Sequence, residues 1–133
     1  MIGLIIAAHG ELADALVDTA TMVVQSPGPL SAISVTKEDN AASVERKLRD
    51  AIQEFNGVDG VLVLTDMFGG TPSQVSMTLH ATGKVEILTG ANLPMLIKAI
   101  QIAPQESDLD AAAHRVRMSG ERAIVIASDL LSK

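Results

Sequence analysis

The sequence alternates short, almost wholly apolar runs with longer segments in which apolar residues recur every three or four positions. A short apolar run is typical of a strand buried on both faces, and the longer spacing is typical of a helix with one apolar side. Strands that alternate with helices pack as a mainly parallel sheet with helices on its faces. The sequence therefore predicts an α/β fold with a doubly wound, mainly parallel sheet.

Five apolar runs are predicted strands, and five amphipathic segments are predicted helices. The strands are residues 2–8, 30–35, 61–64, 85–88 and 123–127, and the helices are residues 11–25, 40–57, 72–80, 92–102 and 107–118, with caps and closing residues included. Asn40 and Asn92 are placed as N-caps, because an Asn side chain can accept a hydrogen bond from a free N–H of the first turn. The Ser26-Pro27-Gly28-Pro29 segment is predicted to stop the first helix.

Length and charge limit the class of protein. The 133 residues correspond to about one domain, so residues 1–133 are predicted to form a single domain. The formal net charge of −6 provides no attraction to a phosphate backbone or an anionic bilayer, so we expect neither nucleic-acid binding nor membrane binding. No stretch approaches the ~18 apolar residues of a membrane-spanning helix, and no basic segment follows Met1.

Cysteine is absent and aromatic residues are rare. The first fact excludes disulfides, thiolate metal sites and Cys nucleophiles, and it is typical of a reducing compartment, so we expect a cytoplasmic protein. Phe55 and Phe68 are the aromatic residues, too few for a site that stacks bases or a flavin. The core is therefore predicted to consist of Ala, Val, Leu, Ile and the six Met residues, Met67, Met77 and Met95 among them.

Several common functional motifs are missing. The sequence has no G-x-G-x-x-G dinucleotide motif, no phosphate-binding P-loop, no G-x-S-x-G nucleophile elbow and no H-E-x-x-H. His80 and His114 stand far apart from each other and from His9, and we expect them to be structural or solvent-facing. We expect no metal and no cofactor.

His9 and Asp66 are the candidate catalytic residues. His9 directly follows the predicted strand 2–8, and Asp66 comes two positions after the end of the predicted strand 61–64. Ligands of parallel α/β sheets bind beyond the carboxyl ends of the strands. A carboxylate that accepts from one imidazole nitrogen leaves the lone pair of the other nitrogen free to attack. The pair is therefore predicted to form an oriented histidine nucleophile.

The segment after Asp66 is predicted to be an anion-binding loop. Gly69 and Gly70 allow the backbone to approach a ligand, and N–H groups at the start of the next helix can receive negative charge. Thr71 is predicted to be the N-cap of that helix, with Pro72 at its first position and Gln74 completing a capping box. Taken singly, each feature also fits a structural role: His9 as a hydrogen-bonded structural residue, Asp66 as a turn former, and the glycine segment as a helix start.

The chain resembles the A domain of the mannose-type enzyme II of the bacterial phosphoenolpyruvate-dependent sugar phosphotransferase system (PTS). Three segments carry the resemblance, which spans nearly the whole chain: the first strand into His9-Gly10, the Asp66-to-Pro72 loop, and the loop 90–96 after the fourth strand. The resemblance implies a homodimer in which a final antiparallel strand, matching 123–127, is exchanged between subunits. It also implies a four-stranded parallel sheet in each subunit.

The resemblance further implies a phosphotransferase activity. His9 would take a phosphoryl group from phosphorylated HPr and pass it to a histidine of a IIB component in sugar uptake, while Asp66 orients the ring. The phosphoryl-binding residues would be Gly10, Phe68, Gly69, Gly70 and Thr71. Because the chain ends at Lys133 without a B domain, the IIB component is expected to be a separate polypeptide.

Two alternatives remain open from the sequence. The family loop often continues with Ser/Thr-Pro-Phe-Asn and carries Trp where this chain has Phe68, whereas this chain reads Thr71-Pro72-Ser73-Gln74. A rim that differs in this way also fits a regulatory module whose phosphorylation state is read by another protein, without coupling to sugar transport. A flavodoxin-like anion-binding domain without phosphoryl chemistry is the third hypothesis.

Overall fold

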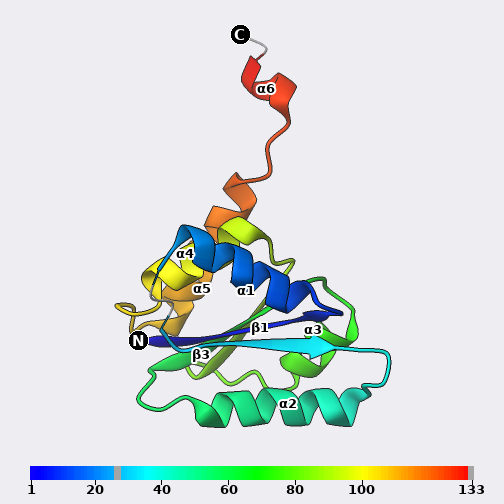
Figure 1. Ribbon diagram of the computed structural model, residues 1–133. Coiled ribbons are helices and arrows are strands. Elements are labelled where there is room, and N and C mark those ends of the chain that lie inside the picture. Colours follow the sequence, from blue (N-terminus) through cyan, green and yellow to red (C-terminus); the bar gives the residue numbers. More distant parts are fainter. Residues whose placement is uncertain (26–27, 132–133) are drawn as a thin grey trace.

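The computed structural model describes residues 1–25 and 28–131, and its centre is a parallel four-stranded sheet (Figure 1). The strands are β1 (Ile2–His9), β2 (Leu30–Val35), β3 (Gly60–Thr65) and β4 (Val85–Thr89), in the spatial order β2-β1-β3-β4. All three strand pairings are parallel. The four predicted parallel strands are therefore confirmed, and β1 and β3 occupy the centre of the sheet.

Helices cover both faces of the sheet, as expected for a doubly wound fold (Figure 1). Residues from α1 (Leu12–Val23), α4 (Leu93–Ile102) and α5 (Leu109–Arg122) share one apolar cluster with one face. Residues from α2 (Ala41–Glu54) and α3 (Thr71–Met77) pack in a second cluster on the other face. Alternate residues of β1 and β3 enter the two clusters, which explains why these two strands are apolar almost throughout.

Two predicted helix caps are confirmed. The Asn40 side chain accepts from the Ser43 N–H at 2.8 Å, and Ser43 Oγ accepts from the Asn40 N–H at 2.9 Å, which together form a capping box. The Asn92 side chain accepts from the Met95 N–H at 3.0 Å. Both interactions satisfy first-turn donors, so the starts of α2 and α4 follow from local sequence.

The start of α3 differs from the prediction. The N-cap is Gly70, whose cap position makes no side-chain hydrogen bond, and Thr71 already belongs to the helix. Ser73 takes the role expected of Thr71 and Gln74, because its Oγ accepts from the Gly69 N–H at 2.9 Å and donates to the Gly70 carbonyl at 3.1 Å. The predicted Thr71 cap and its capping box are therefore wrong, because the buried Ser73 side chain in the first turn bonds the backbone groups of the two glycines instead.

The helix ends also differ by a few residues. α1 ends at Val23 and α3 at Met77, earlier than predicted, whereas α5 continues to Arg122. Residues 26–27 of the predicted stop after α1 lie outside the described residues. None of the helices in the described part of the chain combines the length and apolar character that a bilayer-spanning segment needs.

The C-terminal segment does not form the predicted strand within this chain. Residues 124–126 have no regular secondary structure, and a short helix that the sequence did not predict, α6 (Ala127–Leu131), follows them. The segment leaves the body of the fold (Figure 1), and the side chains of Ile124, Val125 and Ile126 are exposed. A strand needs the backbone groups of a neighbouring strand, and in the described chain this segment has no such neighbour.

The methionines do not fill the core as expected. Met95 is 4% exposed and packs in the α1–α4–α5 cluster, but Met1, Met22, Met67, Met77 and Met118 are exposed. The two clusters consist mainly of Ala, Val, Leu and Ile side chains, and the five exposed methionines are not part of them. Met67 and Met77 instead contribute to the surface near the loop that follows β3.

Candidate functional site

The order of the strands brings two loops together at one edge of the sheet. From β1 the chain crosses to β2 on one side, and from β3 it crosses to β4 on the other side. The carboxyl ends of β1 and β3 therefore lie next to each other at a topological switch point, where parallel α/β sheets form their binding crevices. His9 is the last residue of β1, and Asp66 is the first residue after β3.

His9 and Asp66 are in direct contact. Oδ2 of Asp66 lies 2.8 Å from the ring Nδ1 of His9 and accepts from the His9 backbone N–H at 3.0 Å. Its second oxygen, Oδ1, accepts from the Met67 N–H at 3.0 Å. The carboxylate is 11% exposed and the ring is 47% exposed. The sheet thus holds the acid and the backbone of both loops in one network while leaving the ring accessible.

The charge state of Asp66 determines the form of the ring. Burial alone raises the pKa of Asp66, but hydrogen bonds from the His9 backbone and ring and the attraction of the ring outweigh it, so the pKa lies below its ordinary value of 3.8. Near neutral pH Asp66 is an ionised, acceptor-only group, which requires Nδ1 to carry the proton. In a neutral ring, Nε2 then has a free lone pair.

Gly70 lies against the Nε2 side of the His9 ring. A Cβ atom added at Gly70 would be 2.7 Å from Cε1, a distance that Cβ atoms in proteins essentially never show, and 3.3 Å from Nε2. Within the described residues, Nε2 makes no hydrogen bond. Glycine at this position therefore permits the ring to occupy a place where Asp66 binds one nitrogen and the other is unengaged.

The backbone donors expected to bind an anion are partly occupied. The Gly69 N–H donates to Ser73 Oγ, and the Gly10 N–H donates to the Val35 carbonyl at 2.9 Å. Gly69 and Gly10 both have positive φ angles, of 90° and 60°, so their role visible here is to turn the chain. Ser73 is not among the residues that the sequence predicts for the site. Its position three residues after the cap, where capping-box partners stand, was the available signal.

A hollow of about 580 Å³ lies beside His9. Gly10 and Thr71 line it together with His9. The remaining lining residues are Val35 at the end of β2 and, from the loop between β2 and α2, Thr36, Lys37, Glu38 and Asp39. Phe68 is 71% exposed and lines a different hollow along β4, so the structure separates it from the other expected residues. His9, Gly10, Gly70 and Thr71 thus meet around one site, with Asp66 behind the ring.

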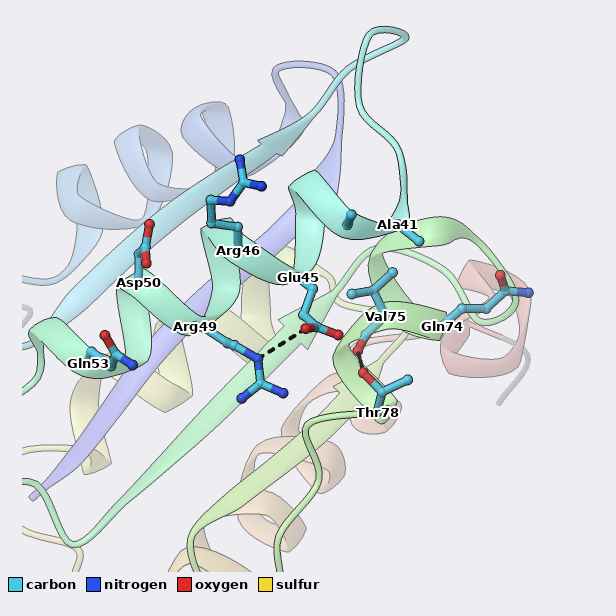
Figure 2. Close-up of a pocket in the computed structure, with 10 residues that line it drawn as sticks. Ala41, Glu45, Arg46, Arg49, Asp50, Gln53, Gln74, Val75 and Thr78 are labelled. Atoms are coloured by element: carbon cyan, nitrogen blue, oxygen red, sulfur yellow. Dashed lines mark hydrogen bonds and ion pairs between the residues drawn. The ribbon is translucent and has the colours of Figure 1, made fainter.

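A larger hollow of about 710 Å³ lies between α2 and α3 (Figure 2). Mixed charges line it, and Glu45 and Arg49 form an ion pair at 3.2 Å on its wall. The described residues that line it include none of the expected site residues and no histidine. Because a site is identified by its chemistry and not by its size, the smaller hollow beside His9 is the stronger candidate.

The other two histidines, His80 and His114, are exposed, and each contacts a different acidic residue. His80 Nε2 is 3.5 Å from Glu86 Oε2, and His114 Nδ1 is 2.9 Å from the Asp110 carbonyl oxygen. Their expected solvent-facing position is confirmed. Across residues 1–25 and 28–131, no three His, Asp or Glu side chains are grouped closely enough to hold a metal ion.

The chain is similar to components of the PTS. A family model described as PTS system fructose IIA component (EIIA-man) matches residues 3–117. The chain is 25% identical to the fructose-specific EIIA component of Bacillus subtilis (strain 168), over all of this chain and 91% of that protein. It is 26% identical to the mannose-specific EIIAB component of Escherichia coli (strain K12), over 82% of this chain and 34% of that longer protein. The crystal structure of EIIA from Streptococcus agalactiae superimposes with a TM-score of 0.87 at 28% identity, covering 97% of this chain and 99% of that one.

Proposed function

The chain belongs to the EIIA-man family, described as PTS system fructose IIA component, and we propose that it is a phosphohistidine carrier. In this proposal His9 accepts a phosphoryl group from phosphorylated HPr and passes it to a histidine of a separate IIB component during sugar uptake. Components of this family are phosphotransferase-type proteins. The single observation that carries the proposal is the 2.8 Å contact between His9 Nδ1 and Asp66 Oδ2.

The chemistry follows from this contact. The Nε2 lone pair attacks phosphorus in line, the Nε2–P bond forms, and the donor's N–P bond breaks with its electron pair returning to the donor nitrogen. Since Nδ1 keeps its proton, the ring becomes positive as Nε2 bonds phosphorus. Asp66 then faces a developing charge of opposite sign, which stabilises the transition state without moving a proton. Transfer to the IIB histidine is the same step in reverse.

The neighbouring residues take supporting roles in this proposal. Gly70 leaves room for the ring, and Thr71 and Gly10 line the space beside it. Gly69 turns the loop, and Phe68 belongs to the exposed rim that a partner protein would meet. Positioning and charge stabilisation are the main requirements of phosphoryl transfer, so the proposed step uses neither a metal nor an added cofactor.

We also propose that the working form is a homodimer built by the C-terminal segment. The outer edge of β4 has no neighbouring strand in the described chain, and a hollow of about 510 Å³ runs beside it, lined in part by Phe68, Met77 and Ile87. The exposed side chains of Ile124, Val125 and Ile126 are apolar, as are those of the residues named in this hollow, so they could pack there while their backbone pairs with the free edge. Residues 123–127 of one copy would pair antiparallel with β4 of the other.

We further propose that residues 1–133 act as one IIA domain in the cytoplasm. The family match over residues 3–117 and the 97% coverage by a solved EIIA structure support the first part. The absence of cysteine supports the second. Affinity capture with phosphorylated and unphosphorylated protein tests the transport role: recovery of a sugar-specific IIB component supports it, and recovery of a regulatory protein alone contradicts it.

Labelling tests the carrier function. The protein is incubated with phosphoenolpyruvate, enzyme I and HPr, and the acid-labile adduct is located by mass spectrometry. We expect one phosphoryl group on His9, none on a His9→Ala variant, and normal labelling of the matched control His114→Ala. Full labelling of His9→Ala would refute the assignment.

A further inference from the structure

One wall of the hollow beside His9 is a turn whose side chains the proposed mechanism does not use. The turn joins β2 to α2, and Lys37 and Glu38 stand at its tip between Thr36 and Asp39. The Asp39 N–H donates to the Thr36 carbonyl at 3.1 Å, which closes the turn. Charged side chains thus line the space that a group on His9 would enter.

Asp39 holds this turn in one conformation. Its Oδ2 accepts from the Thr36 N–H at 2.8 Å and from Lys47 Nζ at 2.9 Å, and its Oδ1 accepts from Ser43 Oγ at 2.8 Å. The side chain is only 7% exposed. Hydrogen bonds from the Thr36 N–H, Lys47 and Ser43 hold the pKa of Asp39 well below its ordinary range. Near neutral pH Asp39 is therefore ionised and can accept all of these hydrogen bonds.

The two lysines near the hollow differ in what they contact. Lys47 Nζ is engaged by Asp39 and by the Ser34 carbonyl at 3.0 Å, so its charge is already balanced. Lys37 is exposed and, within the described residues, has no ion pair or hydrogen bond. Among the described residues that line the hollow, it is the one Lys or Arg. Its charge is therefore available to an anion beside His9.

A phosphoryl group on Nε2 would need such a charge. It carries between one and two negative charges near neutral pH. The N–H groups of Gly10 and Gly69 already have acceptors, and the carboxylates of Asp66 and Glu38 add negative charge nearby. The N–H groups of Gly10 and Gly69 are therefore not free to bind that group, whereas the Lys37 side chain is.

We propose that Lys37 contacts the phosphoryl oxygens of phosphorylated His9 and stabilises that form, with Asp39 as the positioning residue that fixes the turn. This inference rests on the proposed function. Lys37 forms and breaks no covalent bond and transfers no proton. A charge-assisted hydrogen bond made only in the phosphorylated form shifts the transfer equilibrium toward this protein by about tenfold.

The equilibrium constant of phosphoryl exchange with HPr tests this directly. Both proteins are free on each side of that equilibrium, so the constant reports the stability of the phosphorylated form and does not depend on docking affinity. The variants are Lys37→Gln, the charge-conserving Lys37→Arg, and Lys84→Gln as a matched loss of one positive charge outside the hollow. Each is checked for folding by circular dichroism.

We expect the constant to fall about tenfold in Lys37→Gln and to stay within about twofold of the wild type in Lys37→Arg and Lys84→Gln. An unchanged constant in Lys37→Gln overturns the inference while leaving the carrier function intact. An equal fall in Lys84→Gln also overturns it, since net charge would then be the cause. A wild-type chain that takes no phosphoryl group overturns the proposed function and the inference with it.

Discussion

The ring Nδ1 of His9 lies 2.8 Å from Oδ2 of Asp66, although 57 positions separate the two residues in the sequence. The same oxygen also accepts the backbone N–H of His9 at 3.0 Å. One carboxylate oxygen therefore fixes both the main chain and the side chain of the candidate nucleophile.

Replacing Asp66 by Asn is expected to slow phosphoryl transfer by roughly 100-fold while leaving the fold intact. The amide keeps a similar shape but has no charge to balance the positive ring that forms on phosphorylation. Rapid-quench measurement of His9 labelling by phosphorylated HPr checks this. The exposed Asp18→Asn change serves as the control, and an unchanged rate in Asp66→Asn would remove Asp66 from the mechanism.

Replacing Gly70 by Ala is expected to displace the His9 ring. The added Cβ would meet Cε1 at 2.7 Å, so either the ring or the loop must move. We expect shifted imidazole resonances in NMR spectra and a transfer rate lowered by at least about tenfold. Gly57→Ala is the control, because it strains the backbone at a φ of 72° without touching His9. Unshifted His9 resonances in Gly70→Ala would contradict the described contact.

Replacing Asn40 by Ala is expected to lower the free energy of unfolding by about 1 kcal/mol. The change removes the acceptor for the Ser43 N–H at the start of α2. Urea denaturation should show a lower midpoint with an unchanged slope. The loop change Asn56→Ala is expected to stay within about 0.5 kcal/mol of the wild type, and an equal loss in both variants would argue against the capping box.

The free energy of unfolding is expected to fall when the pH drops below about 5. Asp39 and Asp66 both have pKa values below the ordinary 3.8 in the folded protein. The unfolded chain therefore binds protons first, so the stability that these carboxylates contribute above pH 3.8 is lost as the pH falls toward their folded values. Urea denaturation across a pH series measures this. Asp39→Asn should be less stable at neutral pH and should lose less on acidification.

Charged residues in the C-terminal segment are expected to prevent dimer formation. Sedimentation should find the wild type as a dimer and an Ile124→Glu, Ile126→Glu double variant as a folded monomer. Met22→Glu, an exposed apolar position on α1, is the control and should remain a dimer. A monomeric wild type would contradict the exchanged-strand proposal.

Local patterns predicted the elements whose causes are local. The apolar runs marked β1 to β4, and the Asn40 and Asn92 caps follow from one side chain meeting donors three residues away. Placing His9 and Asp66 at strand ends was enough to expect their contact, because carboxyl ends of neighbouring parallel strands share one edge. Thr71 failed as a cap because Ser73, buried under the loop, bonds both glycines instead.

Sequence alone determined the α/β class, the order of the strands, the helix caps of α2 and α4, and the position of His9 and Asp66 at the ends of neighbouring strands. Periodicity and short-range hydrogen bonding are enough for these. Tertiary structure decided that Gly70 lies against the His9 ring, that the N–H groups of Gly10 and Gly69 are already engaged, and that residues 124–126 form no strand within one chain. Each of these depends on atoms brought close by packing, or on a neighbouring strand that the segment does not have within its own chain, and neither is encoded in local spacing.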